Sequence, residues 1–184
     1  MEKDGADIVT ALKQNKIIVM PTDTIYGVVG SALSASVVNR IYSLRRRDLE
    51  KPCIILIGDP GELKKFSITP SAEQERKMGE YWPGPVSIIF ECLDENLSYL
   101  HRGTKTLAFR VPADEELRSM LMKSGPVLAP SANPEGLPPA LSAEEAKKYF
   151  KDSVEMYVDG GELTSKASKV IKLHKDGTVT ILRQ

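Results

Sequence analysis

Short apolar runs recur along this chain, each ended by proline, glycine or a polar turn, and they constrain the fold more than any other feature. The runs are rich in Val and Ile and too short for ordinary helices, which is typical of strands. The last two runs flank Lys175, Asp176 and Gly177, a pattern that predicts a hairpin. The predicted strands lie at about 17–20, 25–30, 53–57, 86–91, 105–111, 127–129, 156–158, 170–173 and 178–182.

Between these runs, apolar residues recur at helical spacing. The last such segment opens with a capping box, because Ser142 and Glu145 are three residues apart. Strands that alternate with helices, with hairpins mixed in, predict an α/β fold with an open, twisted, mixed sheet and flanking helices. No repeat or linker divides the chain, so we interpret 1–184 as a single domain. The predicted helices lie at about 5–14, 37–44, 60–66, 71–81, 114–123 and 142–150.

The charge balance removes two simple interpretations of function. Lys plus Arg is 25 and Asp plus Glu is 25, so the formal net charge of the 184 residues is zero. Nucleic-acid or membrane binding would therefore need a local cluster of charge. No secretory signal pattern opens the chain, and no apolar run approaches the roughly 20 residues of a membrane span. We expect a soluble, cytoplasmic protein without a membrane partner.

Cysteine and histidine are too few for a metal or redox centre of the usual kind. Cys53 and Cys92 each lie beside an apolar run, without the CxxC spacing of such sites. Only His101 and His174 accompany them, so no zinc site is expected. The cysteines are interpreted as small core residues of a protein in a reducing, cytosolic compartment.

The segment at 21–27 reads PTDTIYG, with hydroxyls, a carboxylate and a phenol between two apolar strands. A tight turn in which Asp23 and the threonines bond the backbone is one interpretation. A binding loop is the other.

The segment at 44–52 reads LRRRDLEKP. Its arginines could simply favour the negative end of a helix, with Asp48 and Glu50 paired to them at the surface. Alternatively they form an anion site, since the guanidinium fork matches phosphate. Arg45 and Arg47 are two residues apart, so they converge only if the helix ends there.

Two further segments carry the same ambiguity. The segment at 81–87 reads YWPGPVS, and Trp82 is either a hydrophobic staple for a loop or the wall of a ligand pocket. The segment at 129–136 reads APSANPEG, which is either a turn or a ligand loop at a strand end. Ser131 has no plausible histidine base, and neither a Walker motif nor GxGxxG occurs. If ATP binds, another architecture must hold it.

Taken together and in this order, the four segments resemble the YrdC/Sua5 family, the threonylcarbamoyl-AMP synthases. The resemblance spans about 17–173 and places this chain with the short YrdC type. It implies a YrdC/RibB-like α/β sheet around a deep basic cavity. The motifs that carry it are PTDTIYG at 21–27, WPGP at 82–85, TLAFRVP at 106–112 and SAN at 131–133, followed by Gly136.

The resemblance also implies a reaction. L-Threonine, bicarbonate and ATP would give threonylcarbamoyl-adenylate and pyrophosphate. A partner transferase complex would then move the threonylcarbamoyl group to adenosine 37 of tRNA. The carbamate formed from threonine and bicarbonate attacks the α-phosphorus without further deprotonation, so positioning and charge neutralisation carry the catalysis.

Residue roles follow from the same resemblance. The residues expected to bind the triphosphate and support catalysis are Arg45, Arg47, Ser131 and Asn133. Additional ATP contacts are expected from Lys51 and Ser168. Mg²⁺ would arrive on the phosphates rather than in a protein metal site. The residues expected to line the threonine pocket are Thr22, Thr24, Tyr26 and Ser87, with Arg110 facing substrate charge.

Three positions depart from the family pattern. Arg45 stands where the family usually has lysine, which keeps the charge but broadens the donor geometry. Ser87 replaces a threonine and keeps the hydroxyl. Ser168 keeps a hydroxyl after the double glycine, but Lys169 adds a charge beside the expected nucleotide site.

Two alternatives remain open from the sequence. The first is a non-catalytic, YrdC-like protein that binds RNA or nucleotide through Arg45, Arg46 and Arg47. The second is a divergent paralogue that acts on another carbamoyl or acyl substrate. Ser131 and Asn133 are present, which favours the synthase over both.

Overall fold

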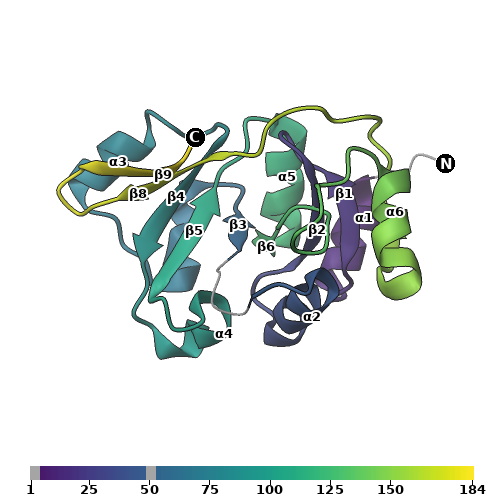
Figure 1. Ribbon diagram of the computed structural model, residues 1–184. Coiled ribbons are helices and arrows are strands. Elements are labelled where there is room, and N and C mark those ends of the chain that lie inside the picture. The colour runs from purple at the N-terminus through teal and green to yellow at the C-terminus, as the bar shows by residue number, and fades with distance from the viewer. Residues whose placement is uncertain (1–4, 49–52) are drawn as a thin grey trace.

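A nine-stranded mixed sheet is the framework of the protein (Figure 1). The computed structural model describes residues 5–48 and 53–184. Within these residues the strand order is β7-β1-β2-β6-β3-β5-β4-β8-β9. The strands are β1 Ile18–Pro21, β2 Tyr26–Ser31, β3 Ile54–Leu56, β4 Val86–Glu91, β5 Thr106–Arg110, β6 Val127–Leu128, β7 Met156–Tyr157, β8 Lys169–Leu173 and β9 Val179–Arg183. Every predicted strand is present within a few residues of its predicted bounds.

Helices flank this sheet, as the sequence predicted. The α-helices are α1 Gly5–Lys13, α2 Ala35–Arg45, α3 Ala72–Met78, α4 Ser98–His101, α5 Glu115–Ser124 and α6 Ala143–Phe150. Shorter 3₁₀ turns are η1 Pro60–Phe66, η2 Glu95–Leu97 and η3 Lys151–Ser153. The predicted helix at 60–66 is the 3₁₀ turn η1. The α4 and η2 turns were not predicted, because segments this short carry no helical periodicity.

The strand pairing confirms a mixed sheet. β1 and β2 form an antiparallel hairpin, whereas β3 pairs with β5 and β4 pairs with β8 in parallel. The predicted final hairpin is β8 and β9, paired antiparallel. In Figure 1 the connection from β7 to β8 crosses the upper edge of the molecule, from one end of the sheet to the other. Distant parts of the sequence therefore meet at this edge.

The core lies on both faces of the sheet at its β1–β2 end, and the larger cluster continues to Phe90 of β4 and Phe109 of β5. Alternate strand residues point to opposite faces, so Ile18 packs with Leu12 and Leu121 from α1 and α5. Val19 belongs to the other cluster, which includes Ile41 of α2. Full burial of each such side chain stabilises the fold by about 1.5–3 kcal/mol. The helices are thereby fixed against the strands whose ends carry polar residues.

Trp82 packs against its own loop and also lines a second cavity of about 390 Å³. It is 6% exposed, its indole Nε1 donates to the Val86 oxygen at 2.7 Å, and its ring centroid lies 6.2 Å from that of Phe90.

Cys53 and Cys92 are both buried free thiols, as predicted. No helix in the described ranges is long and apolar enough to cross a membrane.

Candidate active site

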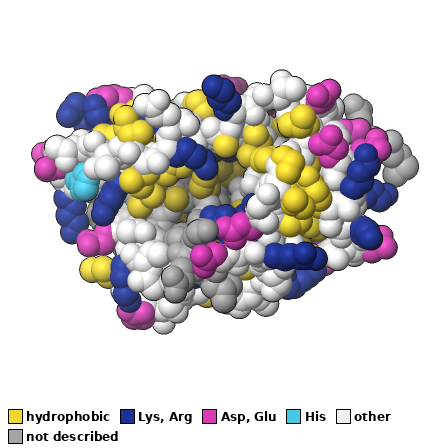
Figure 2. All heavy atoms as spheres, in the orientation of Figure 1, with side chains coloured by type: hydrophobic (Ala, Val, Ile, Leu, Met, Phe, Trp, Pro, Cys, Tyr) yellow, Lys and Arg dark blue, Asp and Glu magenta, His cyan; other side chains and the backbone are white. Residues whose placement is uncertain are grey.

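A cavity of about 360 Å³ opens where several chain segments converge. Its wall comes from the β1–β2 connection, the end of α2, β3, β4, β5, the loop after β6, and the β8–β9 hairpin with the residues before it. The face drawn in Figure 2 is hollowed near its centre, and Lys or Arg side chains lie in the hollow. The predicted site residues on the wall are Thr22, Thr24, Arg45, Arg47, Arg110, Ser131 and Ser168.

The end of α2 brings two of the cations to this cavity. Arg45 is the last helical residue, and Arg46 follows in a left-handed conformation with φ 48° and ψ 37°. The backbone turns there, so Arg45 and Arg47 both reach the wall instead of facing different sides of a helix. The sequence allowed Arg45 and Arg47 to converge only if the helix ended there, and the helix does end there.

Arg45, Ser131 and Asn133 form one hydrogen-bonded group, the Arg45 cluster. Arg45 Nε donates to the Asn133 carbonyl oxygen at 2.9 Å, and Nη2 donates to Ser131 Oγ at 3.0 Å and to Asn133 Oδ1 at 3.2 Å. Arg45 is 3% and Asn133 6% exposed. Burial lowers the pKa of the Arg45 guanidinium from its usual value. The guanidinium thus fixes the SAN loop against α2.

The hydrogen bonds of the SAN loop hold it beside β2 as well. Val28 N donates to the Pro130 oxygen and Ala132 N donates to the Tyr26 oxygen, both at 2.9 Å. Asn133 Nδ2 donates to the Leu137 oxygen at 2.6 Å, which closes the loop on itself. The segment is therefore a hydrogen-bonded turn, and it also places Ser131 on the cavity wall, so both interpretations of the sequence apply.

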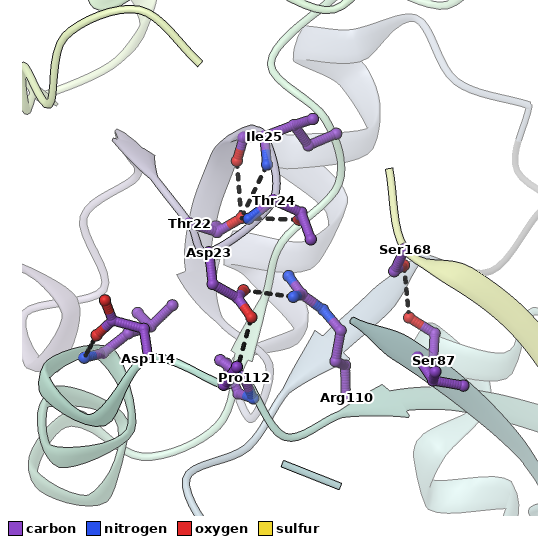
Figure 3. A network of polar contacts seen from close by, with 12 residues as sticks. Thr22, Asp23, Thr24, Ile25, Ser87, Arg110, Pro112, Asp114 and Ser168 are labelled. Atoms are coloured by element: carbon purple, nitrogen blue, oxygen red, sulfur yellow. Dashed lines mark hydrogen bonds and ion pairs between the residues drawn. The ribbon is translucent and has the colours of Figure 1, made fainter. Parts of the chain in front are cut away.

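The two threonines of the PTDTIYG segment likewise form a turn and line the cavity. Thr22 Oγ1 donates to the Ile25 oxygen at 2.7 Å and lies 3.1 Å from Thr24 Oγ1, as Figure 3 shows. Both residues line the cavity. The structure does not place Tyr26 on this wall: it is fully buried, and its hydroxyl donates to the Gly161 oxygen at 2.7 Å. Tyr26 anchors the double-glycine segment instead of lining the predicted pocket.

An ion pair lies beside the threonines. Arg110 Nη1 donates to Asp23 Oδ1, and Asp23 Oδ2 accepts from Ala113 N at 2.9 Å (Figure 3). The two side chains are 5% and 8% exposed, respectively. Burial lowers the pKa of the Arg110 guanidinium, and the Asp23 carboxylate opposes that shift. The sequence did not predict this partner for Arg110.

Ser87 and Ser168 are joined by a hydrogen bond at the side of the cavity formed by β4 and the residues before β8. Their hydroxyl oxygens are 2.8 Å apart, and both residues are buried. Ser168 lines the cavity, whereas Ser87 lies behind it and is not on the wall where we expected it. The sequence assigned these serines to different substrates, yet the structure joins them in one hydrogen bond. Lys169 begins β8 and pairs with Val86 without reaching the wall.

Arg183 is a cavity cation that sequence reasoning missed. Its Nε and Nη2 donate to the Ser168 carbonyl oxygen at 3.1 and 2.7 Å. The only signal was a basic residue at the end of the last predicted strand.

Lys51, expected to help bind ATP, lies outside the described residues. Across 5–48 and 53–184, no three His, Cys, Asp or Glu side chains form a metal-binding group.

The wall of the cavity thus combines several cations with several hydroxyl groups. Arg45, Arg47 and Arg183 supply positive charge around Ser131 and Ser168. Thr22, Thr24 and Arg110 supply hydroxyls and a compensated cation.

Known proteins resemble this chain in sequence and fold. A threonylcarbamoyl-AMP synthase of Pyrococcus abyssi is 31% identical over 82% of this chain and 45% of its own length. That of Bacillus subtilis is 30% identical over 85% and 46%. The chain thus spans about half the length of these relatives. The structure of P. abyssi Sua5 complexed with L-threonine superposes with a TM-score of 0.87, at 29% identity, over 100% of this chain and 55% of that one.

A family profile covers nearly the whole sequence. The profile for Sua5, YciO and YrdC proteins, described as "Telomere recombination", matches residues 10–184. The cavity and its loops lie within this range, and so do all four sequence motifs. The chain therefore belongs to the Sua5/YciO/YrdC family.

Proposed function

We propose that this protein is an L-threonylcarbamoyladenylate synthase, a nucleotidyltransferase that joins L-threonine, bicarbonate and ATP. Its products would be threonylcarbamoyl-AMP and pyrophosphate. Two relatives at about 30% identity carry the name of this activity. P. abyssi Sua5, which has the same fold, has been solved with L-threonine. The chain's own cavity supplies the independent support.

The Arg45 cluster is the observation that carries the proposal. A buried guanidinium holds Ser131 and Asn133 in place beside two further arginines on the cavity wall. Such a convergence of cations, hydroxyls and loop backbone matches the triphosphate of ATP. We assign ATP binding to Arg45, Arg47, Ser131 and Ser168, with Lys51 as a further expected contact. Asn133 was also expected to bind ATP, but it is not on the cavity wall, and we propose that it acts by holding Arg45 and its own loop in place.

The threonine end would lie at the β1–β2 connection. Thr22, Thr24 and Arg110 line the cavity there, and L-threonine has a carboxylate, an ammonium and a hydroxyl that such groups can bond. Tyr26 and Ser87 lie one layer behind. We propose that they act by holding the double-glycine segment and Ser168, respectively, through their hydrogen bonds.

The chemistry requires the two ends to meet. The amine of threonine and bicarbonate condense to a carbamate with loss of one water molecule, and an oxygen of the carbamate then forms a new bond to the α-phosphorus of ATP. The bond from that phosphorus to the bridging oxygen breaks, and pyrophosphate leaves with the electron pair. Arginines at the phosphate end stabilise the charge that develops on the leaving group. Mg²⁺ would be held mainly by the phosphates, as is usual for this ion.

The product's chemistry also suggests its destination. A carbamoyl-adenylate is a mixed anhydride and an activated acyl donor, so a transferase must consume it. We propose that a cytoplasmic tRNA-threonylcarbamoyl transferase complex takes the group to adenosine 37 of tRNA. A direct RNA contact would fall on the exposed Arg46 beside the cavity.

Pyrophosphate release by the purified protein tests this function. We expect release only when L-threonine, bicarbonate and ATP are all present, and loss of signal when each is omitted in turn. Arg47→Ala should weaken ATP binding about tenfold or more, since a charge-assisted bond contributes about 1.5–3 kcal/mol. Arg46→Ala is the matched control. ATP binding without pyrophosphate release would instead favour the non-catalytic alternative.

A further inference from the structure

The cations of the cavity differ in how their charge is compensated. Arg45 donates to a serine hydroxyl and to the carbonyl and amide oxygens of Asn133, which are all uncharged. Arg183 likewise donates to the carbonyl oxygen of Ser168. Arg110 is different, because its partner is the carboxylate of Asp23. Among these three arginines, only Arg110 donates to a carboxylate.

Only one member of the Asp23–Arg110 ion pair lies on the cavity wall. Arg110 lines the wall and Asp23 does not, so the carboxylate approaches the guanidinium from behind. Figure 3 shows Asp23 placed between Arg110 and the start of the segment after β5. Asp23 is itself fixed there by the bond from Ala113 N. The carboxylate therefore holds a fixed position against the cation.

Arg110 nevertheless keeps one donor for a ligand. Its Nε is buried and has no hydrogen-bond partner among the described residues. A ligand cannot reach this enclosed atom, but Nη2 of the same guanidinium makes no hydrogen bond within the described residues and is not enclosed, so Nη2 is the donor that a ligand in the cavity can use. The donor can satisfy one carboxylate oxygen without presenting an uncompensated charge to the site.

From this geometry we propose that Asp23 determines specificity: it neutralises and orients Arg110, so that polyphosphate binds at Arg45 and its neighbouring cations but not at Arg110, which serves the carboxylate of a zwitterionic substrate. The identity of that substrate as L-threonine rests on the proposed function. The exclusion of polyphosphate from Arg110 does not. Asp23 acts through Arg110 and is a positioning residue.

Asp23→Asn isolates the charge effect. Asparagine has the same shape, and its Oδ1 still accepts from Ala113 N, so the local turn keeps its anchor. Arg110 then carries an uncompensated charge in a buried cavity. Because Coulomb attraction is strong at low dielectric, we expect a new anion site there, with affinity for pyrophosphate about tenfold or more above that of the wild type.

Calorimetric titration with inorganic pyrophosphate measures this directly. D23N should bind one more pyrophosphate than the wild-type protein, and this additional binding should compete with L-threonine. Asp23→Glu keeps the charge and should give the wild-type count. The double variant D23N/R110Q removes both charges, so it should lose the additional site and bind L-threonine more weakly than the wild type.

Asp114→Asn is the matched control. Asp114 caps α5 near the pair, accepting from Leu117 N at 2.7 Å, and does not contact Arg110. It should leave the pyrophosphate count unchanged. Thermal melts of each variant confirm that folded protein was titrated. If D23N does not fold, the neutral double variant still tests the idea: a change in its pyrophosphate binding from wild type would show that Arg110 does bind polyphosphate, and would overturn the proposal.

Equal pyrophosphate counts for folded D23N and wild type would also overturn it. An additional site in D23N that persists in D23N/R110Q would do the same, because Arg110 could not then be its source. Failure of the proposed function looks different. In that case wild-type protein would not bind L-threonine or release pyrophosphate, while D23N would still gain its Arg110-dependent anion site.

Discussion

Replacing Arg45 with lysine, the residue that the family resemblance leads one to expect, should destabilise this protein. The guanidinium reaches Asn133 through Nε and Ser131 through Nη2 at the same time. Lysine keeps the charge but concentrates its donors on one atom, so at least one of these bonds is lost. A hydrogen bond to a charged group contributes about 1.5–3 kcal/mol, and the acceptors left behind are buried.

We therefore expect Arg45→Lys to lower the free energy of unfolding by about 2 kcal/mol. For a chain of this size that corresponds to a fall in Tm of about 4–8 °C. Urea and thermal denaturation followed by circular dichroism measure both quantities. Arg46→Lys is the control. Arg46 is the next residue in the chain, it is exposed, and it has the left-handed backbone conformation at the end of α2. If R45K is as stable as R46K, the Arg45 guanidinium does not stabilise the protein through its bonds to Asn133 and Ser131.

Two further predictions concern stability away from the cavity. Ser142→Ala removes the side chain that accepts from Glu145 N, and should cost about 1 kcal/mol in chemical denaturation; no change would mean that the cap is not formed in solution. For Glu155, burial raises the pKa, but bonds from Arg40 and Ile17 N outweigh it and the pKa is lowered overall. Its stabilisation is therefore present at neutral pH and is lost as pH falls below about 4. Glu155→Gln should make the free energy of unfolding less dependent on pH between about 3 and 5, and parallel wild-type and variant profiles would contradict this.

Local patterns predicted the fold well because each strand carries its own signal. Runs such as 86–91 and 105–111 correspond to β4 and β5 almost residue for residue. The α4 turn escaped prediction because four residues cannot show a helical period, and its end depends on Arg102 in a left-handed conformation. Strand order also lay beyond local reasoning, since β4 pairs with β8 through residues about eighty positions away.

The site was predictable only where its residues are close in sequence or carried by a family motif. Arg45 and Arg47 were expected to converge at a helix end, and they do. Asp23 and Arg110 are 87 residues apart, so nothing in either segment indicates the ion pair. Arg183 reaches Ser168 only because β9 folds back along β8. Such contacts depend on tertiary pairing, which sequence pattern alone does not specify.

The left-handed end of α2 has a consequence for ligand affinity. Anions usually bind the opposite pole of a helix, where free amide hydrogens help to hold them. Here the arginines lie at the C-terminal end of a helix, which carries a partial negative charge of about half a unit. The attraction of an anion must therefore come from side-chain cations rather than from the backbone, so occupancy of this cavity should weaken as ionic strength rises and the Debye length shrinks.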